Sequence, residues 1–247
     1  MMTAEQFEWI CREEAEKSNG VQSGIGTYAE KRLHRVLKRW VRDAASCFEV
    51  PVGRSIADVR TEEGIFEIQT KHLDALLPKL QRYLAETDCS ITVIYPLLAM
   101  KRVIRMDRES GEILRTRRVY RGGRLIDGIP ALYPLREILR DPRVRVMLVR
   151  IEADEYRYSE RMRYRREGAF DSELFPRRLT ESVTLCGSRD YRRFLPESES
   201  FYASEYAAYS GLKKRDLYST LNLFCSLEIL SREAEGNKYR YSQIKKS

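Results

Sequence analysis

Residues 55–80 read SIADVRTEEGIFEIQTKHLDALLPKL, and this stretch decides the fold. The apolar and β-branched residues of 55–59 and 64–71 predict two short strands. Gly64 lies between them, where a left-handed turn position favours glycine. Leucines then recur at helical spacing from residue 73 to residue 85. The stretch therefore predicts a tight hairpin followed by a helix.

Further elements are expected on both sides of this stretch. They are helices at 3–18 and 28–42, strands at 47–52, 90–97 and 144–159, a basic hairpin at 101–126 and a short helix within 127–139. Strands and helices that alternate in this way predict an α/β domain with a mixed central sheet flanked by helices.

Two carboxylates lie on the strands of the hairpin, outside its turn. Eight residues separate Asp58 from Glu67, so a tight turn brings the two opposite each other or one position off. Like charges that face each other across strands repel, and a divalent cation such as Mg²⁺ removes that repulsion. Strand alternation places Gln69 on the same face as Glu67, and Lys71 continues that face if the strand extends so far.

A third carboxylate, Glu30, lies on the apolar stripe of the helix at 28–42, beside Leu33 and Leu37. A carboxylate in that position is costly unless it is paired or binds a metal. It can instead reach water near the start of the helix, where the helix dipole favours negative charge. Both readings stay open from the residues alone.

In this order, Glu30 on a helix, then Asp58, then Glu67-Ile68-Gln69 resembles the restriction-endonuclease-like fold of the PD-(D/E)XK nuclease superfamily. The sequence segments GTYAEKRLH, IADV and FEIQTKHLDALLPKL are similar to those of a group of uncharacterised bacterial proteins. The resemblance covers residues 24–98 well and 99–159 loosely.

The resemblance implies that Asp58 and Glu67 hold Mg²⁺ or Mn²⁺ and that Glu30 helps, through a water or as a further ligand. Such a metal polarises a phosphodiester and lowers the pKa of an attacking water. The superfamily has lysine two residues after the second carboxylate, where this chain has Gln69. Glutamine can orient a water but carries no charge, which Lys71 could supply. The alternative is an ordinary hairpin whose acidic residues face solvent.

The C-terminal part reads as a winged helix-turn-helix. Helices are expected at 177–194, 198–211 and 213–227, followed by a hairpin of 229–233 and 238–241. In this motif the N-terminal residues of the second helix of the turn enter the major groove. DNA contacts are therefore expected from Lys213, Lys214, Arg215, Tyr218 and Asn222, and from Lys238 and Arg240 on the wing. The alternative is a winged helix used for packing or dimerisation.

The composition agrees with a DNA partner. The net charge is +8 and the isoelectric point is near 9.2, which favours polyanions. No apolar run approaches the length of a membrane helix, and the N-terminus lacks a secretory signal. Five widely spaced cysteines without a CxxC pair predict reduced, mostly buried thiols. A cytoplasmic protein without a membrane partner is expected.

These expectations combine into a nuclease-like domain at 1–160, a connector at 161–175 and a winged-helix domain at 176–247. The first hypothesis is a Mg²⁺-dependent DNA endonuclease. The second is a catalytically inactive DNA-binding protein that keeps the nuclease fold, and the third is a protein-interaction module. The basic hairpin is either part of a duplex channel or a solvated edge that resists strand pairing. A homodimer is compatible with the first hypothesis, since two DNA strands need two sites.

Overall fold

A computed structural model describes residues 3–16, 27–107, 110–120, 122–159 and 172–244. The helices are α1 (Ala4–Glu16), α2 (Thr27–Val41), α3 (Leu73–Glu86), α4 (Gly187–Tyr191), α5 (Ala203–Ser210) and α6 (Lys214–Ser226), with 3-10 helices η1 (Ala45–Cys47), η2 (Leu125–Leu135) and η3 (Arg192–Phe194). The strands are β1 (Phe48–Val52), β2 (Ser55–Thr61), β3 (Gly64–Ile68), β4 (Ile91–Asp107), β5 (Ile113–Tyr120), β6 (Val144–Ser159), β7 (Ser172–Cys186), β8 (Ser200–Tyr202), β9 (Leu230–Glu235) and β10 (Lys238–Gln243).

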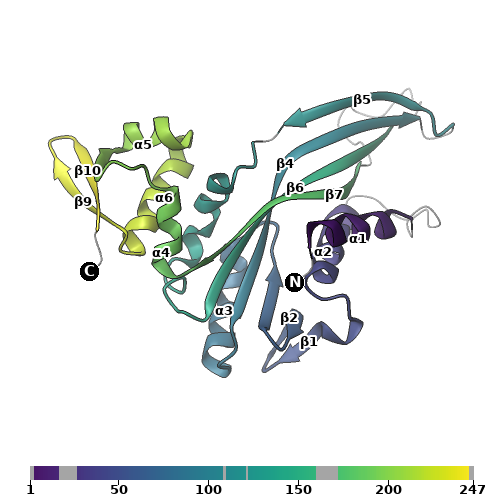
Figure 1. The fold of residues 1–247 in the computed structure, drawn as a ribbon, viewed down its shortest axis with the longest axis horizontal. Helices are drawn as coiled ribbons and strands as arrows, with labels where there is room; N and C mark the ends of the chain where they lie inside the picture. Colours follow the sequence, from purple (N-terminus) through teal and green to yellow (C-terminus); the bar gives the residue numbers. More distant parts are fainter. Residues whose placement is uncertain (1–2, 17–26, 108–109, 121, 160–171, 245–247) are drawn as a thin grey trace. The chain divides into compact units, whose positions relative to one another are not determined.

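A central sheet has the strand order β1-β2-β3-β4-β6-β7, and β5 pairs with β4 (Figure 1). The pairing of β2 with β3 is antiparallel, whereas β3 and β4 run parallel. The predicted α/β fold with a mixed sheet is therefore confirmed. All five residues of β3 are buried, as expected for a central strand that is covered on both faces.

The strand β4 is longer than its sequence suggested. Residues 90–97 and the first arm of the basic hairpin were expected as separate strands, but they form one strand of 17 residues. Its start, at Ile91–Ile94, pairs with β3, and its later part, at Met100–Met106, pairs with β5. The predicted basic hairpin is thus the end of β4 together with β5.

The chain divides into two compact units, and neither is continuous in sequence. One consists of Met1–Phe48, Pro96–Gly123 and Val149–Ser182, and the other of Glu49–Tyr95, Arg124–Leu148 and Val183–Ser247. The long strands β4, β6 and β7 contribute residues to both units. The division expected from the sequence instead placed a boundary at residue 176, which lies within β7.

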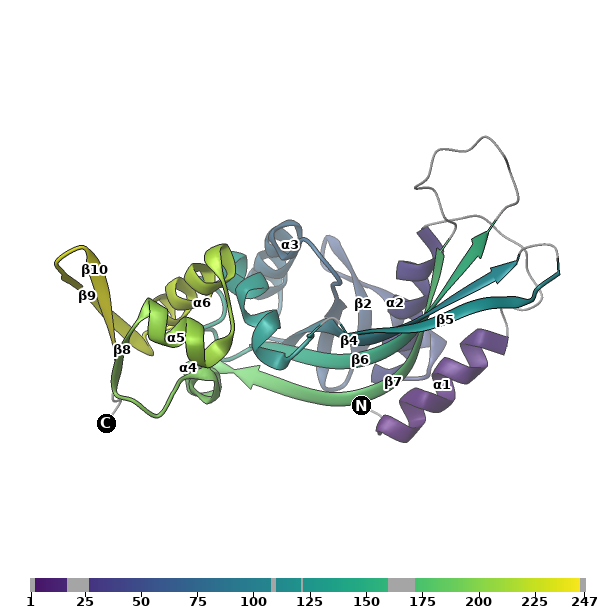
Figure 2. The same ribbon diagram turned by 90° about the horizontal axis from the view of Figure 1, so that it is seen from above.

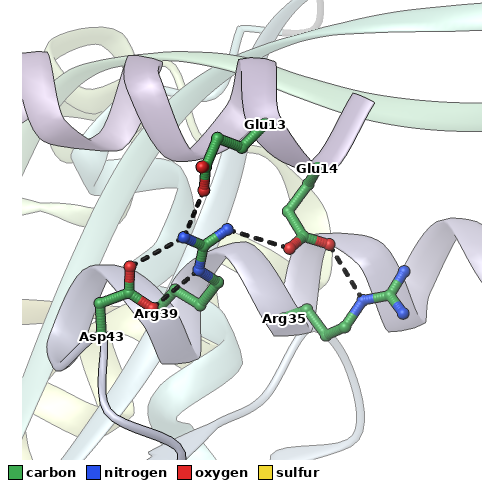
Figure 3. Close-up of polar contacts among 5 residues, drawn as sticks. All are labelled: Glu13, Glu14, Arg35, Arg39 and Asp43. Atoms are coloured by element: carbon green, nitrogen blue, oxygen red, sulfur yellow. Dashed lines mark hydrogen bonds and ion pairs between the residues drawn. The ribbon is translucent and has the colours of Figure 1, made fainter. Parts of the chain in front are cut away.

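In the first unit, α1 packs on α2 through an apolar contact and an ion-pair network. The rings of Phe7 and Trp40 meet edge to face with centroids 6.0 Å apart. Figure 3 shows the guanidinium of Arg39 between three carboxylates: Glu13 at 2.6 Å, Glu14 at 3.0 Å and Asp43 at 2.8 Å. The hydrogen bonding of the Arg39 guanidinium, which donates to the Asp43 carboxylate, is the largest influence that raises the pKa of Arg39.

In the second unit, the C-terminal elements form a three-stranded antiparallel sheet, β8-β10-β9, beside α5 and α6 (Figure 2). The helix expected at 177–194 is wrong: its first ten residues belong to β7, and only α4 and η3 follow. The expected end of a helix at Gly211 is confirmed, since Gly211 has φ +71° and closes α5.

The described ranges contain no helix that is long and apolar enough to cross a membrane. All five cysteines are free thiols, as predicted, but only Cys11 is fully buried.

Candidate functional site

The predicted carboxylate pair lies at the open end of the β2–β3 hairpin, in the second unit. The register pairs Val59 with Phe66, so the next position places Asp58 opposite Glu67. The Asp58 carboxylate accepts a hydrogen bond from the backbone N–H of Ile68, at 2.9 Å. Asp58 thus satisfies a backbone donor of β3 with its side chain, and the two carboxylates stand next to each other.

Glu67 is only 2% exposed, and its two oxygens have different partners. The hydroxyl of Tyr83 donates to Oε1 at 2.9 Å, and Nζ of Lys79 lies 2.6 Å from Oε2. Lys79 and Tyr83 are four residues apart on α3, so one face of this helix presents both. A buried carboxylate therefore has a phenol and an ammonium group as donors.

The pKa of Glu67 is raised above its ordinary value. Burial is the main cause, since it disfavours the charged form, and the neighbouring Asp58 carboxylate adds to it. Lys79 and Tyr83 act in the opposite direction but do not outweigh these two effects. The fold thus holds two carboxylates close together, and this arrangement destabilises the ionised form of Glu67.

Gln69 and Lys71 do not lie where the strand pattern placed them. The strand β3 ends at Ile68, so Lys71 does not continue the face of Glu67 and is exposed. The side-chain amide of Gln69 donates to the backbone oxygens of Lys71 and His72, which lead into α3. His72 has a left-handed backbone with φ 55°. Gln69 therefore stabilises the turn between β3 and α3.

The third predicted ligand, Glu30, lies in α2, but its side chain is outside the described part of the structure. Among the described residues, no three His, Cys, Asp or Glu side chains gather as a metal-binding group. Asp58 and Glu67 nevertheless fit the donor set of Mg²⁺ or Mn²⁺, because these ions take one or two carboxylates and complete their shell with water and phosphate oxygens.

The residues predicted to contact DNA separate into two groups. On α6, Lys214, Arg215 and Tyr218 are exposed, and Lys213 precedes the helix as its N-cap. Asn222 is half-buried, and its amide oxygen accepts a hydrogen bond from Arg232 of β9 at 3.1 Å. Leu217, Leu221 and Phe224 face inward, as the spacing predicted.

Lys238 and Arg240 belong to the other face of the β9–β10 hairpin. Both lie over the ring of Tyr202, at 5.8 and 5.4 Å from its centroid, and Arg240 also pairs with Glu235 at 3.6 Å. Tyr241, the next residue, points into the core. Because side chains alternate along a strand, Lys238 and Arg240 do not share a face with the residues that contact α6.

Several residues of both sites were missed by the sequence patterns. Lys79 lies among the leucines of α3, and its spacing gave no hint of an ion pair with Glu67. Arg232 and Tyr239 lie on the face of the β9–β10 hairpin that is next to α6. The guanidinium of Arg232 lies 5.2 Å from the ring centroid of Tyr239. The alternation of Tyr239 and Tyr241 with Lys238 and Arg240 was the signal that could have found this second pair.

A family model with the description "Domain of unknown function (DUF8091)" matches residues 31–186, more than half of the chain. The match includes Asp58, Glu67 and Lys79, begins one residue after Glu30 and ends with β7. No curated protein and no solved structure matches the chain.

Proposed function

The chain belongs to the DUF8091 family, and since that description names no function, we propose one from the residues: a Mg²⁺-dependent DNA endonuclease centred on Asp58 and Glu67. The observation that carries the proposal is the opposition of these two carboxylates on β2 and β3, with the ammonium of Lys79 2.6 Å from Glu67. The order of α2, β2 and β3 in a mixed sheet agrees with the resemblance to the PD-(D/E)XK superfamily.

Lys79 could supply the positive charge that is missing at the position of Gln69. The position two residues after Glu67 holds an uncharged side chain that is occupied in a turn. Lys79 brings a positive charge to the same carboxylate from α3. We assign to Lys79 the stabilisation of the negative charge that develops on the scissile phosphate. A fixed cation stabilises such a charge more strongly in a half-buried site than in bulk water.

Asp58 and Glu67 would hold the metal, and Glu30 remains a further candidate ligand. When bound, the metal would supply Lewis-acid polarisation of a phosphodiester and a more acidic water. Glu67 would have to be ionised for this role. Because its pKa is raised, metal binding should become stronger as the pH rises.

We further infer that the C-terminal elements act as a winged helix that holds DNA. Support comes from the succession of α5, a glycine turn, α6 and the β9–β10 hairpin. The exposed basic residues Lys214 and Arg215 lie at the start of α6, where groove-reading helices contact DNA. Arg232 replaces Lys238 and Arg240 as the hairpin cation expected to act together with α6.

The test is a cleavage assay on supercoiled, linear, single-stranded and branched DNA, with Mg²⁺ or Mn²⁺ and with a chelator. Asp58→Asn and Glu67→Gln are expected to lower cleavage at least about 10²-fold, since each removes a metal ligand. The matched controls Glu63→Gln and Asp74→Asn change exposed carboxylates of the same hairpin and helix. Equal loss in controls and site variants, or metal-independent cleavage, would contradict the proposal.

A second candidate is a DNA-binding protein that has lost catalysis. It is favoured by one observation, namely that Tyr83 and Lys79 already engage both oxygens of Glu67. Metal-independent DNA binding by wild type, without cleavage of any substrate, would select this alternative. A protein that binds no DNA at low salt would instead point to the interaction module.

A further inference from the structure

Among the described residues of the central sheet, those of β5 are the most exposed, and β5 pairs with β4. Seven of its eight residues are exposed, and three of these are the arginines Arg115, Arg117 and Arg118. In the described part of the chain, no acidic side chain pairs with any of these three arginines. Within the described residues, the strand thus carries three exposed positive charges to which no acidic side chain is paired.

The register of the β4–β5 pair places like charges opposite each other. Arg105 faces Arg115, and Arg102 faces Arg118. Opposed like charges destabilise an antiparallel pair. Asp154 neutralises Arg102, at 2.6 Å, and no acidic side chain of the described ranges does the same for Arg118. A sheet edge could be protected from strand pairing by one or two lysines, so protection alone does not account for this alignment.

Alternation gives the arginines a defined arrangement. Arg115 and Arg117 share one face with Arg105 and the buried Val103, and these four side chains line a hollow of about 30 Å³. Residues two apart on a strand are about 6.7 Å apart, so the guanidinium groups of Arg115 and Arg117 follow each other on this face, whereas Arg118 lies on the opposite face with Arg102. Planar guanidinium groups suit phosphates because they can donate two parallel hydrogen bonds.

We propose that the basic ribbon, defined as residues 101–107 of β4 and 113–120 of β5, binds the sugar-phosphate backbone of a nucleic acid duplex. A row of cations along an exposed strand matches the row of phosphates along a nucleic acid backbone. The inference rests on the proposed function, for which it supplies a substrate contact that does not involve Asp58 or Glu67. The exposed Ile113 and Leu114 are too few to favour a membrane surface over nucleic acid.

The experiment measures binding of a fluorescent DNA duplex by anisotropy between 50 and 200 mM salt, in the presence of a chelator. The ribbon variant is Arg115→Gln/Arg117→Gln/Arg118→Gln. The control variant, Arg54→Gln/Arg145→Gln/Arg189→Gln, removes the same charge from exposed arginines elsewhere. Each phosphate contact contributes about 0.9 to the slope of log K against log salt, so the ribbon variant is expected to lose about 2–3 in slope and at least about tenfold in affinity.

Loss in the ribbon variant beyond that in the control variant supports the proposal. A charge-keeping variant, Arg115→Lys/Arg117→Lys/Arg118→Lys, guards against misfolding and is expected to retain most of the slope. Equal slopes for wild type, ribbon and control variants would overturn the proposal, as would a wild type that does not bind duplex at 50 mM salt. Ribbon-dependent binding to phosphatidylserine vesicles, with DNA binding unchanged, would also overturn it.

Failure of the ribbon and failure of the nuclease are distinguishable. Binding is measured without metal, so it does not depend on whether Asp58 and Glu67 hold a metal ion. If the ribbon variant binds duplex normally, the ribbon proposal fails and the cleavage result still stands. If wild type does not cleave DNA but loses binding in the ribbon variant, only the proposed nuclease function fails.

Discussion

At the scale of single residues, Glu67 is subject to opposing effects. Burial and the Asp58 carboxylate raise its pKa, while Lys79 and Tyr83 favour its charged form. A buried carboxylate beside a second carboxylate is costly to a fold that needs only stability. Such arrangements are typical of functional sites, where stability is given up for chemistry.

Glu67→Gln is therefore expected to stabilise the metal-free protein at neutral pH while abolishing cleavage. The neutral amide removes the desolvated charge and keeps the shape of the side chain. A gain on the order of 1 kcal/mol corresponds to about 2–4 °C in melting temperature for a chain of this size. Thermal unfolding with a chelator at pH 7.5 measures it. A melting temperature well below that of wild type would show that Glu67 serves the fold.

The same residue sets a pH dependence. Since the folded pKa of Glu67 lies above its unfolded value, the unfolded chain loses the proton first as pH rises. The stability contributed by the protonated form is full below the unfolded pKa and is lost as pH rises through the folded pKa. Wild type is thus expected to lose stability relative to Glu67→Gln from about pH 4.5 upward. A difference that stays constant with pH would contradict this origin.

Lys79→Met should destabilise the protein by about 1–3 kcal/mol, because it leaves the carboxylate of Glu67 without its cation. In the Lys79→Met/Glu67→Gln double variant, most of this loss should disappear. Chemical denaturation of the four proteins of this cycle gives the coupling energy, expected to be at least about 1 kcal/mol. Additive effects would mean that the two side chains do not interact.

At the scale of elements, the β2–β3 hairpin depends on the turn residue that introduces β3. Gly64 has φ +132°, and a Cβ there would lie 2.3 Å from the backbone oxygen of Ser90. Gly64→Ala should therefore lower stability by more than about 1 kcal/mol and weaken cleavage through the displaced Glu67. The change Gly111→Ala, in a turn with open space around it, is the matched control for added volume. Equal effects would contradict the steric argument.

The packing of α1 on α2 depends on Arg39, which Figure 3 shows among Glu13, Glu14 and Asp43. Arg39→Met is expected to destabilise by about 2–4 kcal/mol, since it leaves three carboxylates around a position that is only 12% exposed. Arg35→Met is the control: Arg35 also pairs with Glu14, but its side chain is 56% exposed, so a loss below about 1 kcal/mol is expected. Chemical denaturation of the two variants compares their free energies of unfolding with that of wild type.

Local patterns predicted the helices and strands whose partners lie near in sequence, and they missed those decided by distant pairing. The hairpin, α3 and α6 follow from spacing and turn residues. The helix expected at 177–194 overlaps β7, which continues to Cys186. Pairing with β6 decides that segment, and as an edge strand it tolerates Pro176. No local pattern contains that information.

The candidate site was predictable to the same extent. Asp58 and Glu67 come together because a short turn fixes their register. The cation does not come from Lys71, since the strand ends three residues earlier. It comes from Lys79, whose approach depends on how α3 packs against the sheet. Side-chain contacts between elements of this kind are set by tertiary packing, which the spacing of leucines alone does not specify.

At the scale of the whole molecule, the net charge of +8 has identifiable locations. Basic side chains gather on β5 in one unit and around the start of α6 in the other, and each unit carries them on exposed positions. A chain that neutralises several phosphates should show DNA binding that weakens steeply with salt. In the proposed function, the carboxylates of Asp58 and Glu67 are what would distinguish a nuclease from a protein that only binds DNA.

The measurement that tests this distinction most directly is calorimetric titration of Mn²⁺ into wild type, Asp58→Asn and the control Asp74→Asn at pH 6 and pH 8. One metal site is expected in wild type and in the control, with tighter binding at pH 8 because Glu67 must lose its proton, and no site is expected in Asp58→Asn. Equal Mn²⁺ binding by all three proteins, or none by wild type at either pH, would contradict the claim that Asp58 and Glu67 form a metal centre.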